Sequence, residues 1–339
     1  MRDHSRAKKL CSGEKSVSTN LLLVLLFLLV LPSTNARPQK HSMSSGRQTD
    51  QFTFAVKVGM VVLHATVLDS KGILVSGLDK ENFQVFEDGV LQKIDSFSHE
   101  DIPVTVGLVV DNSGSMGPKR AEVIAAALAF ARSSNPQDQM FVVNFNEKVS
   151  FGLPDDTPFT DEADRLRTAM SRIAADGMTA LYDAVATALK HLKQGNRDKK
   201  VLIVISDGGD NASSYKLAQI MVMARQSDAI IYTIGLFDED DPDKNPGALK
   251  QLAKATGGES FLPESVKDAV PICERIARDI RNQYTMAYIP ANGKQDGTYR
   301  VVQVKAGAPG RGRLVVRTRA GYYAPRNSQA LPRARSNLP

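Results

Sequence analysis

The chain has 339 residues, of which 42% are hydrophobic and 24% charged, and its formal net charge is +6. A single hydrophobic core usually stops growing at roughly 250 to 300 residues, so this length predicts two folded domains. The composition excludes a chain that is disordered throughout.

The first 36 residues are predicted to be a signal peptide. Basic residues between Arg2 and Lys15 precede an apolar run of eleven residues, Leu21 to Leu31, and the small residue Ala36 suits cleavage. This run is much shorter than the roughly 20 residues that cross a bilayer as a helix, which argues against a membrane anchor. Lipid anchoring is not expected either, because it requires a Cys after the apolar run and Cys11 precedes it. We therefore expect an exported protein, periplasmic or extracellular, with no transmembrane segment in the mature chain.

Removal of this segment changes the argument from charge. Residues 1–36 carry five basic and two acidic side chains, so cleavage lowers the net charge from +6 to +3. Domains that bind nucleic acid usually have a stronger basic bias, so nucleic acid is not expected as a partner. Cys273 is the one cysteine left, which excludes an internal disulfide, and its spacing from Val270 and Ala277 is typical of a buried helical position.

After a polar linker at 37–51, residues 52–100 predict the first part of a small β-sandwich. Strands are expected at 54–68, 83–86 and 91–97, with turns at 69–72 and 87–89. Fewer than fifty residues would leave such a sheet thinly covered, so it needs further strands from elsewhere in the chain.

Residues 103–282 change character, because apolar strands there alternate with segments of helical period. Strands are expected at 104–110, 140–145, 201–205, 230–234 and 259–262, and helices near 119–132, 161–173, 181–193, 215–226, 248–256 and 266–282. Continuous apolar strands between amphipathic helices predict a doubly wound α/β domain, whose mostly parallel sheet is covered on both faces.

From residue 283 to 325 the pattern returns to β, with strands expected at 284–289, 298–305 and 313–318. We expect these strands to complete the first β segment, so that the α/β domain is an insertion within a β-sandwich. Arg313, Arg317 and Arg319 would share one strand face by period-two alternation, and we expect that face to be exposed. Residues 326–339 are expected to form a disordered tail.

The candidate site is an oxygen-rich turn at the end of the first apolar strand of the α/β domain. Asp111, Ser113 and Ser115 lie on that turn, Asp207 follows the strand at 201–205, and Thr179 precedes a helix. Ligands of doubly wound sheets bind beyond the carboxyl ends of the strands, so these side chains are expected at one rim. Hydroxyl and carboxylate oxygens favour Mg²⁺, or else Mn²⁺ or Ca²⁺, over Zn²⁺ or Cu²⁺. The alternative is a turn that only caps the following helix.

Two neighbouring polar segments receive simpler interpretations. Asp210 and Asn211 are expected to cap the helix that follows them. The acidic loop at 238–243 lacks the ligand spacing of an EF-hand and is expected to be a solvated loop.

The order Asp-x-Ser-x-Ser, then Thr, then Asp resembles the metal-ion-dependent adhesion site, MIDAS, of von Willebrand factor type A domains, the family of the integrin inserted domains. The resemblance covers about residues 103–282. Leu78 to Gly89 and Gly321 to Pro325 also resemble the margins of an exported, chiefly acidobacterial, group of related proteins. The resemblance implies that Ser113, Ser115 and, when a ligand is engaged, Thr179 touch the cation, while Asp111 and Asp207 act largely through water. It implies a protein partner whose Asp or Glu carboxylate completes the metal shell, and hence an exported, adhesion-type binding module.

Two other classes of function are alternatives to a binding module. The chain has no phosphate-binding Gly-x-x-x-x-Gly-Lys, no Gly-x-Ser-x-Gly elbow and no evident pair of nucleophile and base, so an enzyme is not expected. A metal-assisted hydrolase remains a distant alternative. A structural envelope component, with a metal that does not exchange, is the second alternative.

Overall fold

The computed structural model describes residues 59–238 and 244–326. The predicted signal peptide, the linker, the tail from 327 and residues 239–243 of the acidic loop lie outside this description. Within the described residues, no helix is both long and apolar enough to cross a membrane.

The α/β part is built on a six-stranded sheet with the order β10-β9-β8-β5-β6-β7. Its strands are β5 (Val104–Asp111), β6 (Gln139–Phe145), β7 (Val149–Phe151), β8 (Lys199–Ser206), β9 (Ala229–Gly235) and β10 (Ser260–Phe261). The strands pair in parallel except for β7, a three-residue edge strand that runs antiparallel to β6. The predicted mostly parallel sheet is therefore confirmed, and β7 is an addition that the sequence pattern did not indicate.

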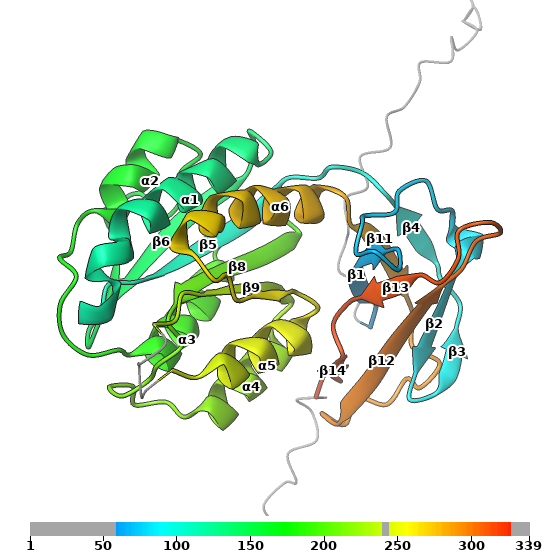
Figure 1. The fold of residues 1–339 in the computed structure, drawn as a ribbon. Coiled ribbons are helices and arrows are strands. Elements are labelled where there is room, and N and C mark those ends of the chain that lie inside the picture. Colours follow the sequence, from blue (N-terminus) through cyan, green and yellow to red (C-terminus); the bar gives the residue numbers. More distant parts are fainter. Residues whose placement is uncertain (1–58, 239–243, 327–339) are drawn as a thin grey trace, which may run out of the picture. The chain divides into compact units, whose positions relative to one another are not determined.

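Helices cover both faces of this sheet (Figure 1). They are α1 (Arg120–Ser133), α2 (Ala163–Met170), α3 (Leu181–Leu192), α4 (Leu217–Gln226), α5 (Pro246–Thr256) and α6 (Ala269–Arg281), with short 3-10 turns η2 (Gly114–Lys119) and η3 (Val266–Asp268). Helix α1 packs against α2 and α6, while α4 packs between α3 and α5. Because both faces are covered, every residue of β5 and β9 is buried, which explains why these strands are continuous apolar runs.

The remaining strands form two antiparallel four-stranded sheets, ordered β13-β1-β11-β4 and β14-β12-β2-β3. They are β1 (Val61–Leu68), β2 (Phe83–Glu87), β3 (Val90–Gln92), β4 (Ser96–Ser98), β11 (Tyr284–Tyr288), β12 (Tyr299–Ala306), β13 (Val315–Arg317) and β14 (Gly321–Tyr323), with the 3-10 turn η1 (Lys80–Asn82) before β2. Each sheet combines strands from before and after the α/β part. The predicted insertion of the α/β domain into a β-sandwich is therefore confirmed at the level of topology.

The prediction of one strand at 91–97 is wrong in detail, because the chain forms two strands there. Strand β3 pairs with β2 in one sheet, and β4 pairs with β11 in the other. Between them Ile94 is buried in the core shared by the two sheets. Leu91, Ile94 and Phe97 recur at every third position across both strands, so the apolar pattern alone could not show where the chain changes sheets. The turn predicted at 87–89 is present, and positive φ angles of 48° at Asp88 and 82° at Gly89 suit a tight hairpin.

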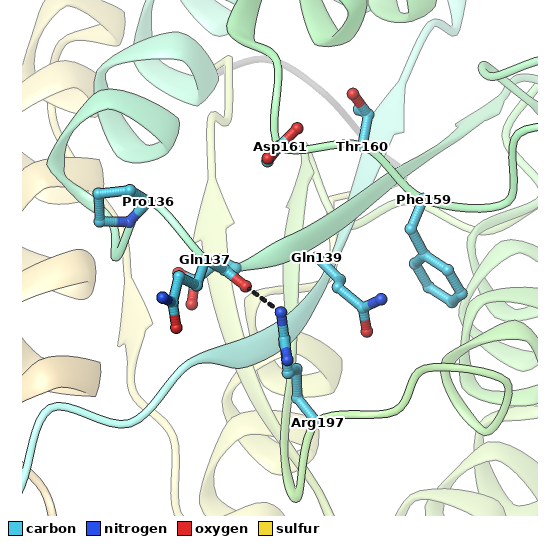
Figure 2. A pocket seen from close by; sticks show the side chains of 8 residues that line it. Pro136, Gln137, Gln139, Phe159, Thr160, Asp161 and Arg197 are labelled. Carbon is cyan, nitrogen blue, oxygen red and sulfur yellow. Dashed lines mark hydrogen bonds between the residues drawn. The ribbon is translucent and has the colours of Figure 1, made fainter. Parts of the chain in front are cut away.

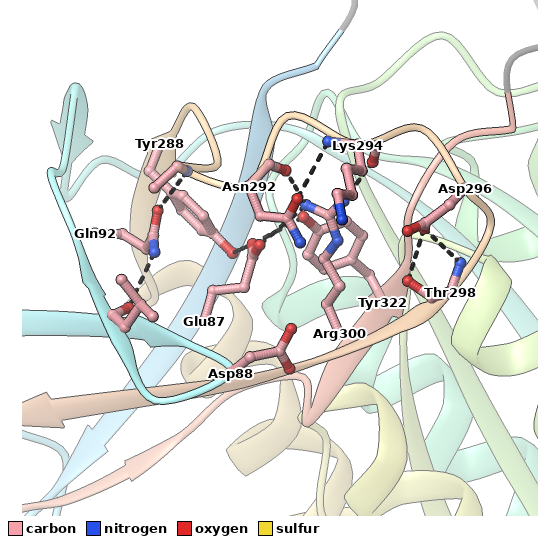
Figure 3. A network of polar contacts seen from close by, with 12 residues as sticks. Glu87, Asp88, Gln92, Tyr288, Asn292, Lys294, Asp296, Thr298, Arg300 and Tyr322 are labelled. Carbon is pink, nitrogen blue, oxygen red and sulfur yellow. Dashed lines mark hydrogen bonds and ion pairs between the residues drawn. The ribbon is translucent and has the colours of Figure 1, made fainter.

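The β-sandwich contains a buried charge pair (Figure 3). Glu87 and Arg300 are 3% and 2% exposed, and their side chains lie 3.0 Å apart. The hydroxyls of Tyr288 and Tyr322 each donate to Oε2 of Glu87 at 2.8 Å, and Arg300 also donates to the carbonyl oxygens of Asn292 and Lys294. Because both charges have hydrogen-bond partners, the pair is tolerated in the core and fastens the loop before β12.

The prediction that Arg313, Arg317 and Arg319 form an exposed face is wrong for two of the three residues. Arg313 is exposed, but Arg317 donates to Glu259 and, at 2.7 Å, to Asp279 on α6, and Arg319 donates to Asp228 at 3.0 Å. Strand β13 contains only Arg317 of the three arginines, while Leu314 and Val316 pack against the sandwich core as the alternation predicts. The alternation could not show that acidic groups from the α/β part cover two of the three guanidinium groups.

Candidate metal centre

The sheet order places the two predicted carboxylates at one rim. Strand β5 lies between β6 and β8, and the register sets Val110 beside Ile205. Asp111 ends β5 and Asp207 follows β8 directly, so both residues lie at the carboxyl ends of adjacent parallel strands. The chain leaves the two strands in different directions, since β5 continues into α1 and β8 leads to α4 on the opposite face. This is the switch point at which doubly wound sheets bind their ligands.

The turn after β5 is organised by Asp111. Its Oδ1 accepts the backbone N–H of Ser113 at 2.8 Å, and its Oδ2 accepts the hydroxyl of Ser206 at 2.5 Å. Asp111 and Ser113 are 3% and 2% exposed, so these contacts are largely removed from water. Both oxygens of Asp111 thus hold the chain in place, which suits a carboxylate that orients other ligands.

Two serines link this turn to Asp207. The hydroxyls of Ser113 and Ser115 lie 3.2 Å apart, and the Ser115 hydroxyl donates to Oδ2 of Asp207. Asp207 is 2% exposed, whereas Ser115 is exposed at the surface of the turn. The structure therefore brings four of the five predicted site residues into one chain of side-chain contacts.

The fifth residue, Thr179, lies in a segment that we call the Thr179 loop, residues 176–180. Its own N–H donates to Oδ1 of Asn211 at 2.9 Å, and its carbonyl oxygen accepts the N–H groups of Asn211 and Ala212. The N–H of Gly114 donates to the carbonyl oxygen of Gly177 at 3.2 Å. The contacts described for Thr179 are those of its backbone, and they place it between the turn after β5 and the loop after Asp207.

The expected role of Asp210 and Asn211 is partly corrected. Asp210 accepts the N–H of Tyr182, so it caps the start of α3, the preceding helix in the chain, and not α4. Asn211 accepts from Thr179. Both residues fasten the Thr179 loop and the helix after it, a role that sequence neighbourhood alone did not indicate.

Sequence reasoning missed Glu147, in the loop between β6 and β7. Its Oε2 accepts the N–H of Met178 at 3.2 Å, and the carbonyl oxygen of the preceding Asn146 accepts the N–H of Ala180 at 2.7 Å. Glu147 is exposed and belongs to no recognisable spacing. A lone loop glutamate far from the other site residues in sequence gives no signal that could have identified it.

The carboxylate of Asp111 is buried beside a second negative charge. Burial, reinforced by the negative charge of Asp207, raises the pKa of Asp111 to about 6. Hydrogen bonds from Ser206 and Ser113 act in the opposite direction. Hydroxyl and amide donors thus offset only part of the cost of the buried negative charge of Asp111. Lys119, a nearby base, instead donates to the carbonyl oxygen of Leu236 and to Asp238.

The available donor atoms fit a hard cation. Two carboxylates and the serine and threonine hydroxyls offer only oxygen, as Mg²⁺, Mn²⁺ and Ca²⁺ prefer. Among the described residues there is no group of three or more His, Cys, Asp or Glu that could hold a metal ion. A soft-metal site is therefore not supported there, and a cation at this rim would depend on hydroxyl ligands.

The pocket drawn in Figure 2 lies at the other end of the strands. Gln139 begins β6, and the Asp138 carboxylate accepts the N–H of Val104 at the start of β5 at 2.8 Å. The residues that line the pocket are Pro136, Gln137, Asp138, Gln139, Phe159, Thr160, Asp161 and Arg197. Because β5 and β6 are parallel, this pocket is separate from the rim that carries Asp111 and Asp207.

Cys273 is not a candidate nucleophile. It is fully buried in α6, as expected from its spacing, and burial together with Glu274 raises the pKa of its thiol to about 12.

Comparison with known proteins relates a segment of the α/β part to a known family. Residues 106–209 match the family model of the von Willebrand factor type A domain. An uncharacterized protein of Synechocystis sp. is 22% identical over 187 residues, which are 53% of this chain and 42% of that protein. The chain therefore spans less than half the length of this curated relative.

Two solved structures are similar to the chain. A von Willebrand factor type A protein from Catenulispora acidiphila is 14% identical, with a TM-score of 0.49, over 81% of this chain and 76% of that one. The vWF domain of the type V pili tip protein Mfa5 from Porphyromonas gingivalis is 14% identical, with a TM-score of 0.45, over 53% of this chain and 95% of that one.

Proposed function

We propose that this protein, whose α/β part is a von Willebrand factor type A domain, is an exported protein-binding module of the adhesion type that depends on a divalent cation. The observation that carries the proposal is the pair of buried carboxylates, Asp111 and Asp207, at the carboxyl ends of adjacent strands. Buried charges are costly without a counter-charge, and the donors that reach this pair are hydroxyl and amide groups. A divalent cation would compensate both carboxylates.

Each predicted residue has a distinct role in this proposal. The hydroxyls of Ser113, Ser115 and Thr179 would hold the cation, because hydroxyl oxygens leave it strongly positive. Asp111 and Asp207 would orient the ligands and supply the negative charge. The bound cation would supply a Lewis-acid centre that accepts a carboxylate from another molecule. Mg²⁺ suits this role because it retains exchangeable waters in protein sites.

The partner would be a protein that presents an Asp or Glu side chain. A von Willebrand factor type A domain suggests a module for protein interaction. The mature chain's charge of +3 supports a protein partner better than nucleic acid. Export rests on the predicted signal peptide at residues 1–36, with a product in the periplasm or outside the cell.

Catalysis is not part of the proposal. The histidines with described contacts bond elsewhere: His64 contacts Thr285, His99 contacts the carbonyl oxygen of Asn282, and His191 contacts that of Pro158. None of these three histidines is thereby supplied as a base to activate a water or a serine at this rim. The competing proposal is a structural envelope component in which the same cation does not exchange.

The first test removes the carboxylate that organises the turn. Asp111→Ala should lower the affinity for Mg²⁺ or Mn²⁺ about 10- to 100-fold, the range for groups that orient metal ligands. Isothermal titration calorimetry on the purified mature protein measures this affinity. Asp155→Ala is the matched control, because Asp155 is exposed in the loop after β7.

Partner binding is tested on the same variants. Immobilised protein is incubated with the envelope fraction of the source cells in Mg²⁺, in EDTA, and in EDTA followed by Mg²⁺. A partner should be retained by the wild type and by Asp155→Ala only with the cation present, and should be lost from Asp111→Ala. Equal retention by Asp111→Ala would refute the proposal.

A further inference from the structure

The first three residues of the Thr179 loop, 176–178, are held by hydrogen bonds and not by burial. Asp176, Gly177 and Met178 are exposed, and Met178 directs 53% of its surface to solvent, while Thr179 beside it is 6% exposed. An exposed segment takes its position from its polar contacts. The partners of those contacts therefore hold residues 176–178 in place next to the buried Thr179.

The loop between β6 and β7 supplies contacts on both sides of Thr179. Oε2 of Glu147 accepts the N–H of Met178 at 3.2 Å, and the carbonyl oxygen of Asn146 accepts the N–H of Ala180 at 2.7 Å. Two consecutive residues of one loop thus bracket Thr179. The bond to Glu147 involves a side chain, so its loss can be tested by substitution.

Gly177 is a second, independent sign that this contact is close. Its φ is +79°, a region that residues with a Cβ rarely adopt, and a Cβ built there would lie 1.7 Å from Oε2 of Glu147. Glycine, which has no side chain, therefore occupies the position where Glu147 contacts the Thr179 loop.

The Thr179 loop also forms two backbone hydrogen bonds with the turn after β5. Gly114 donates to the carbonyl oxygen of Gly177 at 3.2 Å, and Asp176 donates to that of Asn112 at 3.0 Å. A shift of residues 176–178 would therefore disturb the backbone on both sides of Ser113, as well as Thr179 itself.

We infer that Glu147 is a positioning residue of the proposed cation site, which acts by holding the Thr179 loop against the turn after β5. This inference rests on the proposed function. Glu147 contributes through the hydrogen bond that it accepts from Met178 and supplies no ligand to the cation. Its effect should therefore depend on an acceptor oxygen at this position and not on a negative charge.

The test compares two substitutions by calorimetric titration of the full mature chain with Mg²⁺ and with Mn²⁺. Glu147→Ala removes the acceptor and should weaken cation binding about five-fold, the effect of one hydrogen bond of ordinary strength. Glu147→Gln keeps an acceptor oxygen and should bind within two-fold of the wild type. Glu100→Ala is the charge control, because Glu100 is exposed and precedes the start of β5, whereas the site lies at the end of that strand.

A second measurement follows the loop without any cation. Amide hydrogen exchange at Met178 in metal-free protein should be faster in Glu147→Ala than in the wild type, and unchanged in Glu147→Gln. An equal loss of affinity in Glu147→Gln and Glu147→Ala would mean that the glutamate acts by charge alone, which overturns the inference.

The outcomes separate this inference from the proposed function. A wild type that binds the cation while Glu147→Ala binds it equally well overturns the role of Glu147 and leaves the proposed function standing. A wild type that binds neither Mg²⁺ nor Mn²⁺ overturns both.

Discussion

His64 on β1 is a residue whose protonation the fold opposes strongly. Burial, together with the positive charges of Lys199 and Arg319, lowers the pKa of its imidazole to about 3. Its Nδ1 lies 3.1 Å from the hydroxyl of Thr285 on the paired strand β11. The neutral ring is thus a fixed part of the sheet, whereas in the unfolded chain it titrates near 6.5.

This difference predicts an acid-sensitive contribution to stability. Between pH 6.5 and 3 the unfolded state binds a proton that the folded state does not, so the free energy of unfolding falls as the pH falls. From pH 7 to 4.5 the loss due to His64 should be about 2 kcal/mol. Urea unfolding of wild type and His64→Gln at several pH values measures it. The wild type should lose more stability than the variant over this interval, and two parallel curves would contradict the assignment.

Individual residues differ in how far the sequence reveals them. Asp111 and Asp207 were predictable because each follows a buried apolar strand, and the ends of adjacent parallel strands meet at one rim. The link between them through Ser113 and Ser115 depends on side-chain conformations that a spacing does not contain. Glu147 could not be found, because its role depends on the approach of the Thr179 loop, about thirty residues further along the chain.

At the scale of elements, the hydrophobic pattern identified the six helices of the α/β part by their period. It identified the four longest strands as continuous apolar runs, because these strands are buried on both faces. It failed for the three-residue strand β7, which is too short to show any period. It also failed for the change of sheet between β3 and β4. A strand pair is specified by its partner, and the partners of β3 and β4 lie in different sheets.

The contact between β13 and α6 predicts a large cost for one substitution. Arg317 donates to Asp279, which is 1% exposed, and to Glu259, which also binds Arg275. Arg317→Ala would leave the Asp279 carboxylate buried without its main partner and should lower the free energy of unfolding by about 3 kcal/mol, the lower end for a broken buried pair. Urea denaturation measures the loss.

Two further variants separate charge burial from lost packing in this contact. Arg313→Ala, on the exposed neighbouring arginine, should change stability by less than about 0.5 kcal/mol. Adding Asp279→Asn to Arg317→Ala should recover part of the loss, because the buried charge is then removed. A double variant that is no more stable than Arg317→Ala alone would show that the carboxylate is not the source of the cost.

At the scale of the whole molecule, the α/β domain interrupts a β-sandwich whose sheets need strands from both sides of the insertion. The sequence could predict this arrangement, because the first β segment is too short to form a covered core by itself. It could not predict which strands pair, since several pairings satisfy the same alternation. The described core of the sandwich accordingly contains residues from before the α/β part, such as Val61 and Ile94, and from after it, such as Tyr284 and Tyr322.

The stability of the folded molecule should also report on the cation. A ligand that binds only the folded state stabilises it by about 2.7 kcal/mol at 100 times its Kd. Added Mg²⁺ should therefore raise the melting temperature of metal-free wild type in a concentration-dependent way, and EDTA should reverse the rise. Asp111→Ala should need about 10- to 100-fold more Mg²⁺ for the same rise. A structural envelope component whose metal does not exchange would behave differently. The protein would be purified with its metal, and further Mg²⁺ would leave the melting temperature unchanged. Because partner capture requires an exchangeable position on the cation, a melting temperature that does not respond to Mg²⁺ would favour the structural component over the binding module.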